Sequence, residues 1–115
     1  MQTEPLTIID LGQCAAQFKN VYSNIPVALV NNHVIRLSVM TEPYFWHRHP
    51  NSDESFLVVE GSVFIDLDDQ TVELLPGQLF TIPRNVNHRT RPNGSRSVNI
   101  TFELENMETV RTGFD

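Results

Sequence analysis

The sequence has one cysteine, few basic residues and no long apolar run, and each shortage excludes a class of protein. Cys14 is the only cysteine, so no disulfide can form within the chain. The chain has 8 basic and 14 acidic residues, and the net charge of -6 predicts neither a nucleic-acid nor a membrane partner. The longest apolar run, residues 25–30, contains Pro26 and is far shorter than the about 20 residues of a membrane span.

The beginning of the sequence favours a cytoplasmic location. Residues 1–10, MQTEPLTIID, lack the positive charge and the apolar stretch of a secretory signal. A single cysteine also suits a reducing compartment. The 115 residues correspond to about one domain, and the hydrophobic fraction of 40% argues against disorder. We therefore expect a soluble cytoplasmic protein with a single domain over residues 1–115.

Short strands separated by turns dominate the pattern. Turn signals recur about every 8 to 12 residues, the spacing of an all-β sandwich or barrel. Apolar residues alternate with other residues over 35–40 and 63–68, as in strands with one buried face. Residues 56–59 are apolar on both faces, which suits a strand that is covered on both sides. The sequence thus predicts an all-β domain.

Two turns and one helix can be placed more closely. Pro76 and Gly77 suit a type II turn, and Asn93 with Gly94 is the strongest hairpin signal in the chain. Near the start, Asp10 is suited to cap a short helix that runs through Phe18 and has one apolar face. Cys14 lies on that face, which predicts a buried thiol rather than a nucleophile.

Four residues have the character of a metal site. His47 and His49 project from one face of a strand, because residues two apart on a strand share a face. Glu54 opens the next apolar strand, which we expect to return alongside the first and bring its carboxylate close. His88, from a separate strand, completes the set. Three imidazoles and a carboxylate suit one divalent first-row metal ion, with one or two coordination positions open.

Each of these residues also has an ordinary explanation when it is taken alone. His47 or His49 can be a surface histidine, and Glu54 can be a solvated carboxylate. His33 has no partner in the sequence, so we expect it to be structural or exposed. Only the combination of the four residues points to a metal.

Two motifs connect these residues to a known family. The order His47-x-His49-x4-Glu54-x6-Gly61 resembles the first conserved motif of the cupin superfamily. Gly77, followed after five residues by Pro83 and then by His88, resembles the second motif. More narrowly, the segments 46–61 and 82–89 are similar to small single-domain bacterial cupins that are often described as mannose-6-phosphate-isomerase-like.

The resemblance implies a fold and a cofactor. The fold would be a double-stranded β-helix, or jelly-roll barrel, with a lead-in over residues 1–24 that includes the short helix and a barrel over about 25–105. His47, His49, Glu54 and His88 would bind one ion of zinc, manganese, iron, nickel or cobalt in the barrel mouth. By family habit the protein would be a homodimer.

Three departures weaken the transfer of any particular activity from the family. Thr41 and Asn85 stand where the motifs usually have glycine, and Pro92 stands where the second motif usually ends in asparagine. None of these positions is a ligand position, so the expected fold and metal site are unaffected.

Three further residues are candidates for substrate binding. Phe45 should share the face of His47, and Phe56 should line the same cavity, although both can equally be core residues. Arg36 is the one cation in an apolar strand and can bind an anionic group if it faces inward. Otherwise it is solvated or paired with an acid such as Glu73.

Two functions remain open at this point. The first is a metal-dependent enzyme of the isomerase or dioxygenase type, acting on a small molecule such as a sugar phosphate or a small organic acid. The alternative is a module that binds a sugar or organic acid without converting it. A structural cupin without metal fits less well, because all four ligand residues are present. The sequence identifies no catalytic residue.

Overall fold

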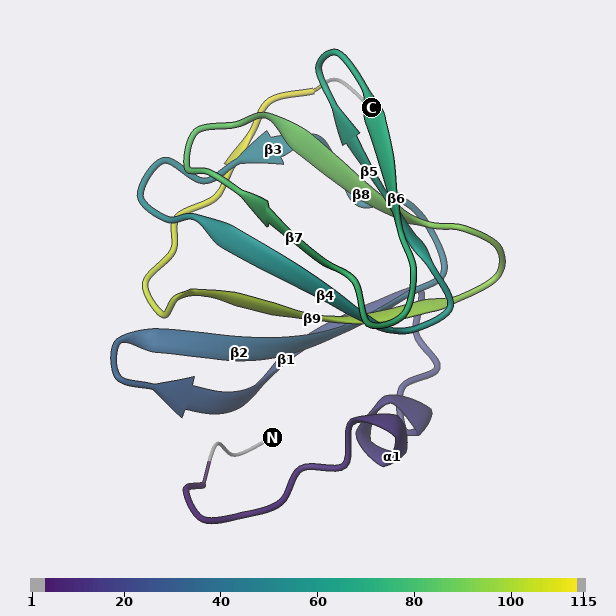
Figure 1. Ribbon diagram of the computed structural model, residues 1–115, viewed down its shortest axis with the longest axis vertical. Helices are drawn as coiled ribbons and strands as arrows, with labels where there is room; N and C mark the ends of the chain where they lie inside the picture. The colour runs from purple at the N-terminus through teal and green to yellow at the C-terminus, as the bar shows by residue number, and fades with distance from the viewer. Residues whose placement is uncertain (1–3, 114–115) are drawn as a thin grey trace.

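Two five-stranded antiparallel sheets face each other in the computed structural model, which describes residues 4–113 (Figure 1). The first sheet has the order β1 (Tyr22–Val30), β2 (His33–Met40), β9 (Ser97–Leu104), β4 (Glu54–Glu60) and β7 (Leu79–Ile82). The second has the order β10 (Val110–Arg111), β3 (His47–Arg48), β8 (His88–Pro92), β5 (Val63–Leu67) and β6 (Thr71–Leu74). This architecture confirms the predicted jelly-roll fold.

The chain changes sheet repeatedly, and this alters one predicted turn. The loop with Asn93 and Gly94 was expected to close a hairpin, but it joins β8 to β9, which lie in different sheets. β8 pairs with β5, whereas β9 pairs with β2 and β4. The local signal indicated a turn correctly, but the long-range pairing decided which strands the turn connects. The turn at Pro76 and Gly77 is present as predicted, with Gly77 at φ 85°.

A short helix covers the outer face of the first sheet (Figure 1). This helix, α1 (Leu11–Ala16), is capped by Asp10, whose side chain accepts a hydrogen bond of 2.9 Å from the Gln13 amide. The prediction extended the helix to Phe18, two residues too far, and Phe18 instead packs beside it on the same apolar cluster. The cluster is composed of Cys14, Ala15, Val27, Leu37, Val39, Val98 and Ile100.

The apolar residues Ile35, Leu37 and Val39 of β2 therefore face outward, toward the helix. Leu37 and Val39 belong to the cluster under α1, whereas Arg36 and Ser38 line a cavity between the sheets. A second apolar cluster fills the interior on the side of β4 to β7, with Phe56, Val58, Val63, Ile65, Leu74 and Ile82. The remaining interior, beside β1, β2 and β9, is lined with polar side chains.

The strands extend slightly beyond the predicted barrel of residues 25–105, since β1 begins at Tyr22 and β10 ends at Arg111. Within residues 4–113, no helix has the length and apolar character needed to cross a membrane. The homodimer stays a prediction.

Candidate metal centre and adjoining cavity

Three histidines and one glutamate meet between the two sheets. His47 and His88 are direct partners in the β3–β8 ladder, and His49 follows one residue after β3. Glu54 begins β4 in the opposite sheet. One ligand atom from each of the four residues lies within 4.8 Å of the others, and all four residues are buried. The structure thus brings the predicted cluster together.

The route by which Glu54 arrives differs from the prediction. β4 was expected to return alongside the histidine strand, but it pairs with β7 and β9 instead. Glu54 therefore reaches the histidines across the space between the sheets. The ligands come from both walls of the barrel, so the site depends on the packing of the two sheets rather than on one hairpin.

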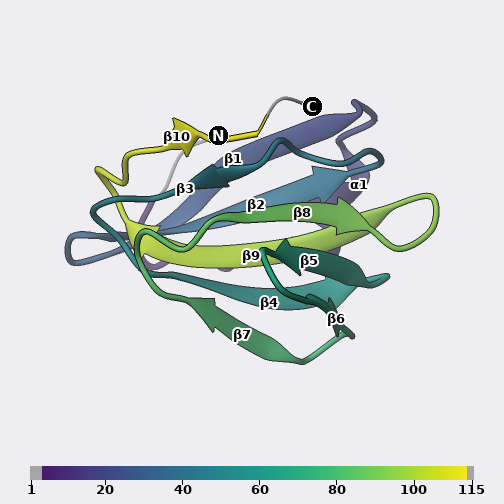
Figure 2. The same cartoon turned by 90° about the horizontal axis from the view of Figure 1, so that it is seen from above.

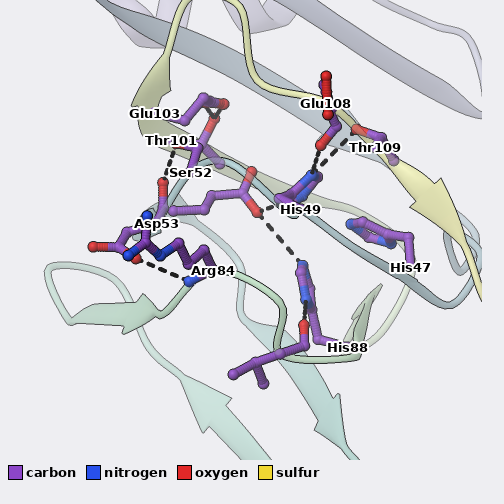
Figure 3. A network of polar contacts seen from close by, with 12 residues as sticks. His47, His49, Ser52, Asp53, Arg84, His88, Thr101, Glu103, Glu108 and Thr109 are labelled. Carbon is purple, nitrogen blue, oxygen red and sulfur yellow. Dashed lines mark hydrogen bonds and ion pairs between the residues drawn. The ribbon is translucent and has the colours of Figure 1, made fainter.

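Backbone carbonyls determine which nitrogen of each histidine faces the centre (Figure 3). The Nδ1 atoms lie at hydrogen-bonding distance from carbonyl oxygens: 2.7 Å from His47 to Phe45, 2.9 Å from His49 to Glu108 and 2.9 Å from His88 to Val86. A carbonyl only accepts, so each Nδ1 carries the proton and donates it. In the neutral ring, each Nε2 then has a free lone pair.

Two of those lone pairs, on His49 and His88, are directed at a carboxylate. Nε2 of His49 lies 3.2 Å from Glu54 Oε1, and Nε2 of His88 lies 3.5 Å from the same oxygen. Among the described residues, none of these three buried atoms has a hydrogen-bond partner. Two lone-pair acceptors repel each other at this distance unless a proton or a cation lies between them. A divalent ion satisfies all of them at once, so this donor set fits the predicted metal.

The surroundings keep two of the four donors, His47 and Glu54, ready to bind. Burial, reinforced by the neighbouring His88, lowers the pKa of His47 to about 4. Burial opposes ionisation of Glu54, but contacts with His49 and His88 outweigh it and lower the pKa of this carboxyl to about 2. For His49, burial lowers the pKa, yet the Glu54 carboxylate and the Glu108 carbonyl together raise it above its usual value. Glu54 and His47 are therefore deprotonated at neutral pH and do not have to release a proton when they bind an ion.

A cavity of about 230 Å³ adjoins the cluster, and His47, His49 and Glu54 form part of its wall. The opposite wall carries a row of polar side chains across three neighbouring strands, Asn24 on β1, Ser38 on β2 and Asn99 on β9. The Asn24 amide donates a hydrogen bond of 2.8 Å to the Ser38 hydroxyl. Hydroxyl and amide groups thus define the chemistry of this wall.

Glu103 is the unexpected ionisable group of the cavity. It is 2% exposed, and the Thr101 hydroxyl lies 2.7 and 3.0 Å from its two carboxylate oxygens. Burial and, after it, the negative charge of Glu54 raise its pKa to about 7. A carboxyl with this pKa can both accept and release a proton near neutral pH.

The side chain of Asn99 has no hydrogen-bond partner in the described part of the chain. It is 1% exposed and lines the cavity, and neither its amide nitrogen nor its amide oxygen has a hydrogen-bond partner among residues 4–113. Buried amides are normally satisfied, because leaving one unpaired costs about 1–3 kcal/mol. Asn99 therefore offers one acceptor and two donors to a molecule inside the cavity.

The candidate substrate residues lie in different places. Arg36 faces the cavity, and its guanidinium lies 3.4 Å from the Asn24 side-chain oxygen, not beside Glu73. Phe56 also lines the cavity. Phe45 is not among the described residues that line it. β3 begins only at His47, so the alternation on which that prediction rested does not extend back to Phe45.

Tyr44 takes the place expected for Phe45. Its ring lines the cavity, stacks on Tyr22 at 4.7 Å and touches the edge of His47 at 5.3 Å. Phe45 stacks behind it, with ring centroids 4.1 Å apart, and the guanidinium of Arg111 lies over the ring of Phe45. Burial raises the pKa of Tyr44, so its hydroxyl keeps the proton and can donate it in a hydrogen bond.

The arginines near His88 have a structural role outside the cavity. Arg89 and Arg91 both bind the Asp66 carboxylate, at 3.0 and 2.8 Å. Arg84 is exposed. Of the residues described as lining the cavity, Arg36 is the one arginine.

The sequence analysis missed Glu103, Thr101 and Asn99, although β9 carries a readable pattern. Polar and apolar residues alternate strictly over Ser97–Leu104. Val98, Ile100 and Phe102 face the helix-covered side, and Asn99, Thr101 and Glu103 face the interior. A strand that turns its polar face into a barrel signals a ligand cavity, so this pattern identifies the three residues once the inward face of β9 is known.

Comparison with known proteins assigns the family. Residues 38–102 match the family model described as Cupin domain. YdbB of Bacillus subtilis (strain 168), named an uncharacterized protein, is 41% identical over 97 residues, which cover 84% of this chain and 85% of YdbB. CurC of Streptomyces cyaneus, named a polyketide synthase, is 40% identical over 58 residues, 50% of this chain and 38% of CurC.

A solved structure agrees. The cupin-2 domain containing protein from Shewanella frigidimarina NCIMB 400 superposes with a TM-score of 0.80 and 26% identity, over 85% of this chain and 95% of that chain. Fold, motif spacing and family match coincide, and the chain belongs to the cupin family.

Proposed function

We propose that the protein is a metal-dependent enzyme that moves a proton on a small oxygen-rich molecule, at a carbon next to a carbonyl group. The observation that carries this proposal is the position of Glu103, a buried carboxyl that lines the same cavity as the metal cluster and whose pKa is raised by burial above its usual value. Proton transfer is the chemistry that needs such a group. Between the isomerase and dioxygenase types, Glu103 favours the isomerase type.

The four clustered residues would hold the ion, which supplies a Lewis acid to polarise the carbonyl oxygen of the substrate. Glu103 in its ionised form takes a proton from the carbon next to that carbonyl. It returns this proton to the former carbonyl carbon while the substrate's own hydroxyl proton passes to the former carbonyl oxygen, so that a carbonyl and a hydroxyl exchange places and no oxidant is consumed. Thr101 holds the carboxyl through its hydroxyl during both steps.

The cavity also limits the substrate. Its volume of about 230 Å³ is below the about 300–1,000 Å³ of sites for drug-sized ligands, so the substrate is small. Of the described residues, Arg36 is the one arginine that lines the cavity, and Glu103 and Glu105 are part of the same wall. This balance favours a molecule with at most one negative charge, a small keto or hydroxy acid, over a doubly charged sugar phosphate. The name of CurC agrees with a substrate rich in carbonyl groups.

Hydrogen exchange at carbon tests the proposal directly. Metal-loaded protein is incubated in D2O with a panel of small hydroxy-keto acids, and deuterium incorporation next to the carbonyl is followed by NMR. We expect catalysed exchange, reduced about 100- to 10,000-fold in Glu103→Gln. A parallel measurement of dissolved oxygen detects the alternative reaction, that of a dioxygenase.

Three results would contradict this assignment. Oxygen uptake without deuterium incorporation would indicate a dioxygenase. Saturable binding with neither exchange nor oxygen uptake would indicate a binding module. Equal exchange rates in the wild type and in Glu103→Gln would remove Glu103 from the reaction.

A further inference from the structure

The chain that follows β9 returns across the cavity as a strap of residues 105–112. β10, within the strap, pairs with β3, placing Arg111 opposite His47 and Val110 opposite Arg48 (Figure 2). The Thr112 amide donates a hydrogen bond of 3.0 Å to the Trp46 carbonyl. The strap is therefore docked on the strand that carries the first metal ligand.

The strap also forms one wall of the cavity. Glu105, Met107 and Thr109 all line it, together with the metal ligands. Any movement of the strap away from β3 would open the cavity along this wall.

The ring of His49 is oriented by a hydrogen bond to the strap, whereas the rings of His47 and His88 are oriented by carbonyls close to them in the chain. His47 and His88 donate to carbonyls only two residues before them in the chain. His49 donates to the carbonyl of Glu108, which is 59 residues away in the sequence, and the Thr109 hydroxyl lies 3.2 Å from the same nitrogen (Figure 3). When the strap is undocked, His49 loses the partner that directs its Nε2 toward the metal.

Asn51 holds the strap in this position. Its side-chain oxygen accepts a hydrogen bond of 2.8 Å from the Glu108 amide, and its side-chain nitrogen donates one of 3.1 Å to the Asn106 carbonyl. Asn51 lies only two residues after His49. This one side chain therefore binds the strap at two backbone groups, and one of them belongs to Glu108, whose carbonyl orients His49.

We propose that the strap couples metal binding to closure of the cavity, with Asn51 as the positioning residue. Docking of the strap places the Glu108 carbonyl on His49, and metal binding at His49 in turn stabilises the docked strap. Linkage requires the two effects to be equal in free energy. The inference rests on metal binding as proposed above, but not on the reaction that follows.

Other metal sites indicate how much the affinity for the metal should change. Removing a group that orients a histidine ligand typically weakens metal binding about 10- to 100-fold. We expect Asn51→Ala to weaken binding of Zn²⁺ within this range. The matched control is Asn93→Ala, because Asn93 is an exposed asparagine with a side-chain hydrogen bond to Glu73, far from the strap in the fold.

The experiment has two measurements. Affinity for Zn²⁺ is determined for the wild type and both variants by competition with a chromogenic chelator. Amide hydrogen exchange over residues 105–112 is determined by mass spectrometry for the wild type with and without Zn²⁺, with the β5–β6 hairpin as internal reference. We expect Zn²⁺ to slow amide exchange in the strap at least tenfold and to leave the exchange rate of the hairpin unchanged. We expect the affinity of Asn93→Ala for Zn²⁺ to lie within twofold of that of the wild type.

Each remaining outcome is decisive. Exchange in the strap that is independent of Zn²⁺, or unchanged affinity in Asn51→Ala, would overturn the coupling while leaving the metal centre intact. If Asn51→Ala fails to fold, the wild-type exchange measurement still decides. A wild type that binds no Zn²⁺ at all would overturn the coupling and the metal centre together, whereas deuterium incorporation into substrate bears only on the proposed reaction.

Discussion

Glu54 and Glu103 lie side by side on adjacent strands of one sheet, and their surroundings shift their pKa values in opposite directions. β4 and β9 pair with Ser55 opposite Phe102, so the next position along the ladder places Glu54 beside Glu103 on the inner face. The histidines lower the pKa of Glu54 to about 2, whereas burial and the charge of Glu54 raise that of Glu103 to about 7. One carboxyl is thus a permanent anion that suits a metal, and its neighbour is a proton carrier.

The raised pKa of Glu103 predicts a pH-dependent stability difference in metal-free protein. A carboxyl whose pKa is higher in the folded state favours folding at low pH, and this contribution is lost as the pH rises through about 7. Glu103→Gln cannot ionise, so we expect it to be more stable than the wild type at pH 9, by up to about 3 kcal/mol. Urea unfolding at pH 5, 7 and 9 measures the difference, which should shrink toward pH 5. A constant difference across this range would contradict the shift.

The metal cluster predicts which histidines carry the ion. We expect the double variant His47→Ala, His49→Ala to lose stoichiometric metal, because half of the donor set is removed. His33→Ala should keep its metal, since His33 is exposed. Plasma emission on protein purified without chelator or metal affinity resin measures the content and identifies the element. Equal metal content in the two variants would rule out this centre.

Metal binding should release a proton from one particular ligand. Only ligands that are already deprotonated bind without proton release. The pKa of His49 lies above its usual value, whereas those of His47 and Glu54 are lowered to about 4 and about 2. We therefore expect affinity to fall as the pH drops below 7, and we expect His49→Ala to release fewer protons per bound ion at pH 6 than the wild type. Calorimetric titration in buffers of different ionisation enthalpy counts the protons, and equal proton release in the two proteins would contradict the raised pKa of His49.

Asn99 predicts a gain in stability at the cost of function. Its buried amide lacks a partner among the residues that the structure describes, so replacing it with a side chain of similar size and no polar atoms removes a desolvation penalty. We expect Asn99→Leu to raise the free energy of unfolding by about 1–3 kcal/mol and to reduce deuterium exchange on the substrate panel. Thr101→Val is the control, because Thr101 has a partner in Glu103 and its loss should destabilise the protein. A destabilised Asn99→Leu would indicate that the amide is satisfied.

The ligand set could be predicted from the sequence because its information is local. The spacing of His47 and His49 places both on one side of the chain, and the motif spacing identifies Glu54 and His88 as their companions. The route of Glu54 to the site was predicted wrongly, since the sheet that a strand joins is decided by partners far away in the chain. β4 lies between β7 and β9, and nothing near residue 54 specifies that arrangement.

The cavity wall was harder to predict for a related reason. Asn99 and Glu103 acquire their roles from neighbours on β2 and β4, which come from the first half of the chain. The shift of the Glu103 pKa depends on burial and on Glu54, and neither is visible in the residues around position 103. The alternation along β9 was present in the sequence, but its meaning depends on which face the helix covers.

The apolar faces of β2 and β9 point outward, toward α1, and this arrangement has an evolutionary consequence. The core beneath α1 contains four apolar residues of β2 and β9, namely Leu37, Val39, Val98 and Ile100. Because these residues supply the apolar packing of the two strands, the inward residues of the same strands contribute less to stability. Mutations at positions such as Ser38 or Asn99 can then alter what the interior accepts while the scaffold keeps its stability. A lineage built on this plan can acquire new substrates by changing a few inward side chains, without rebuilding the barrel that holds the ion.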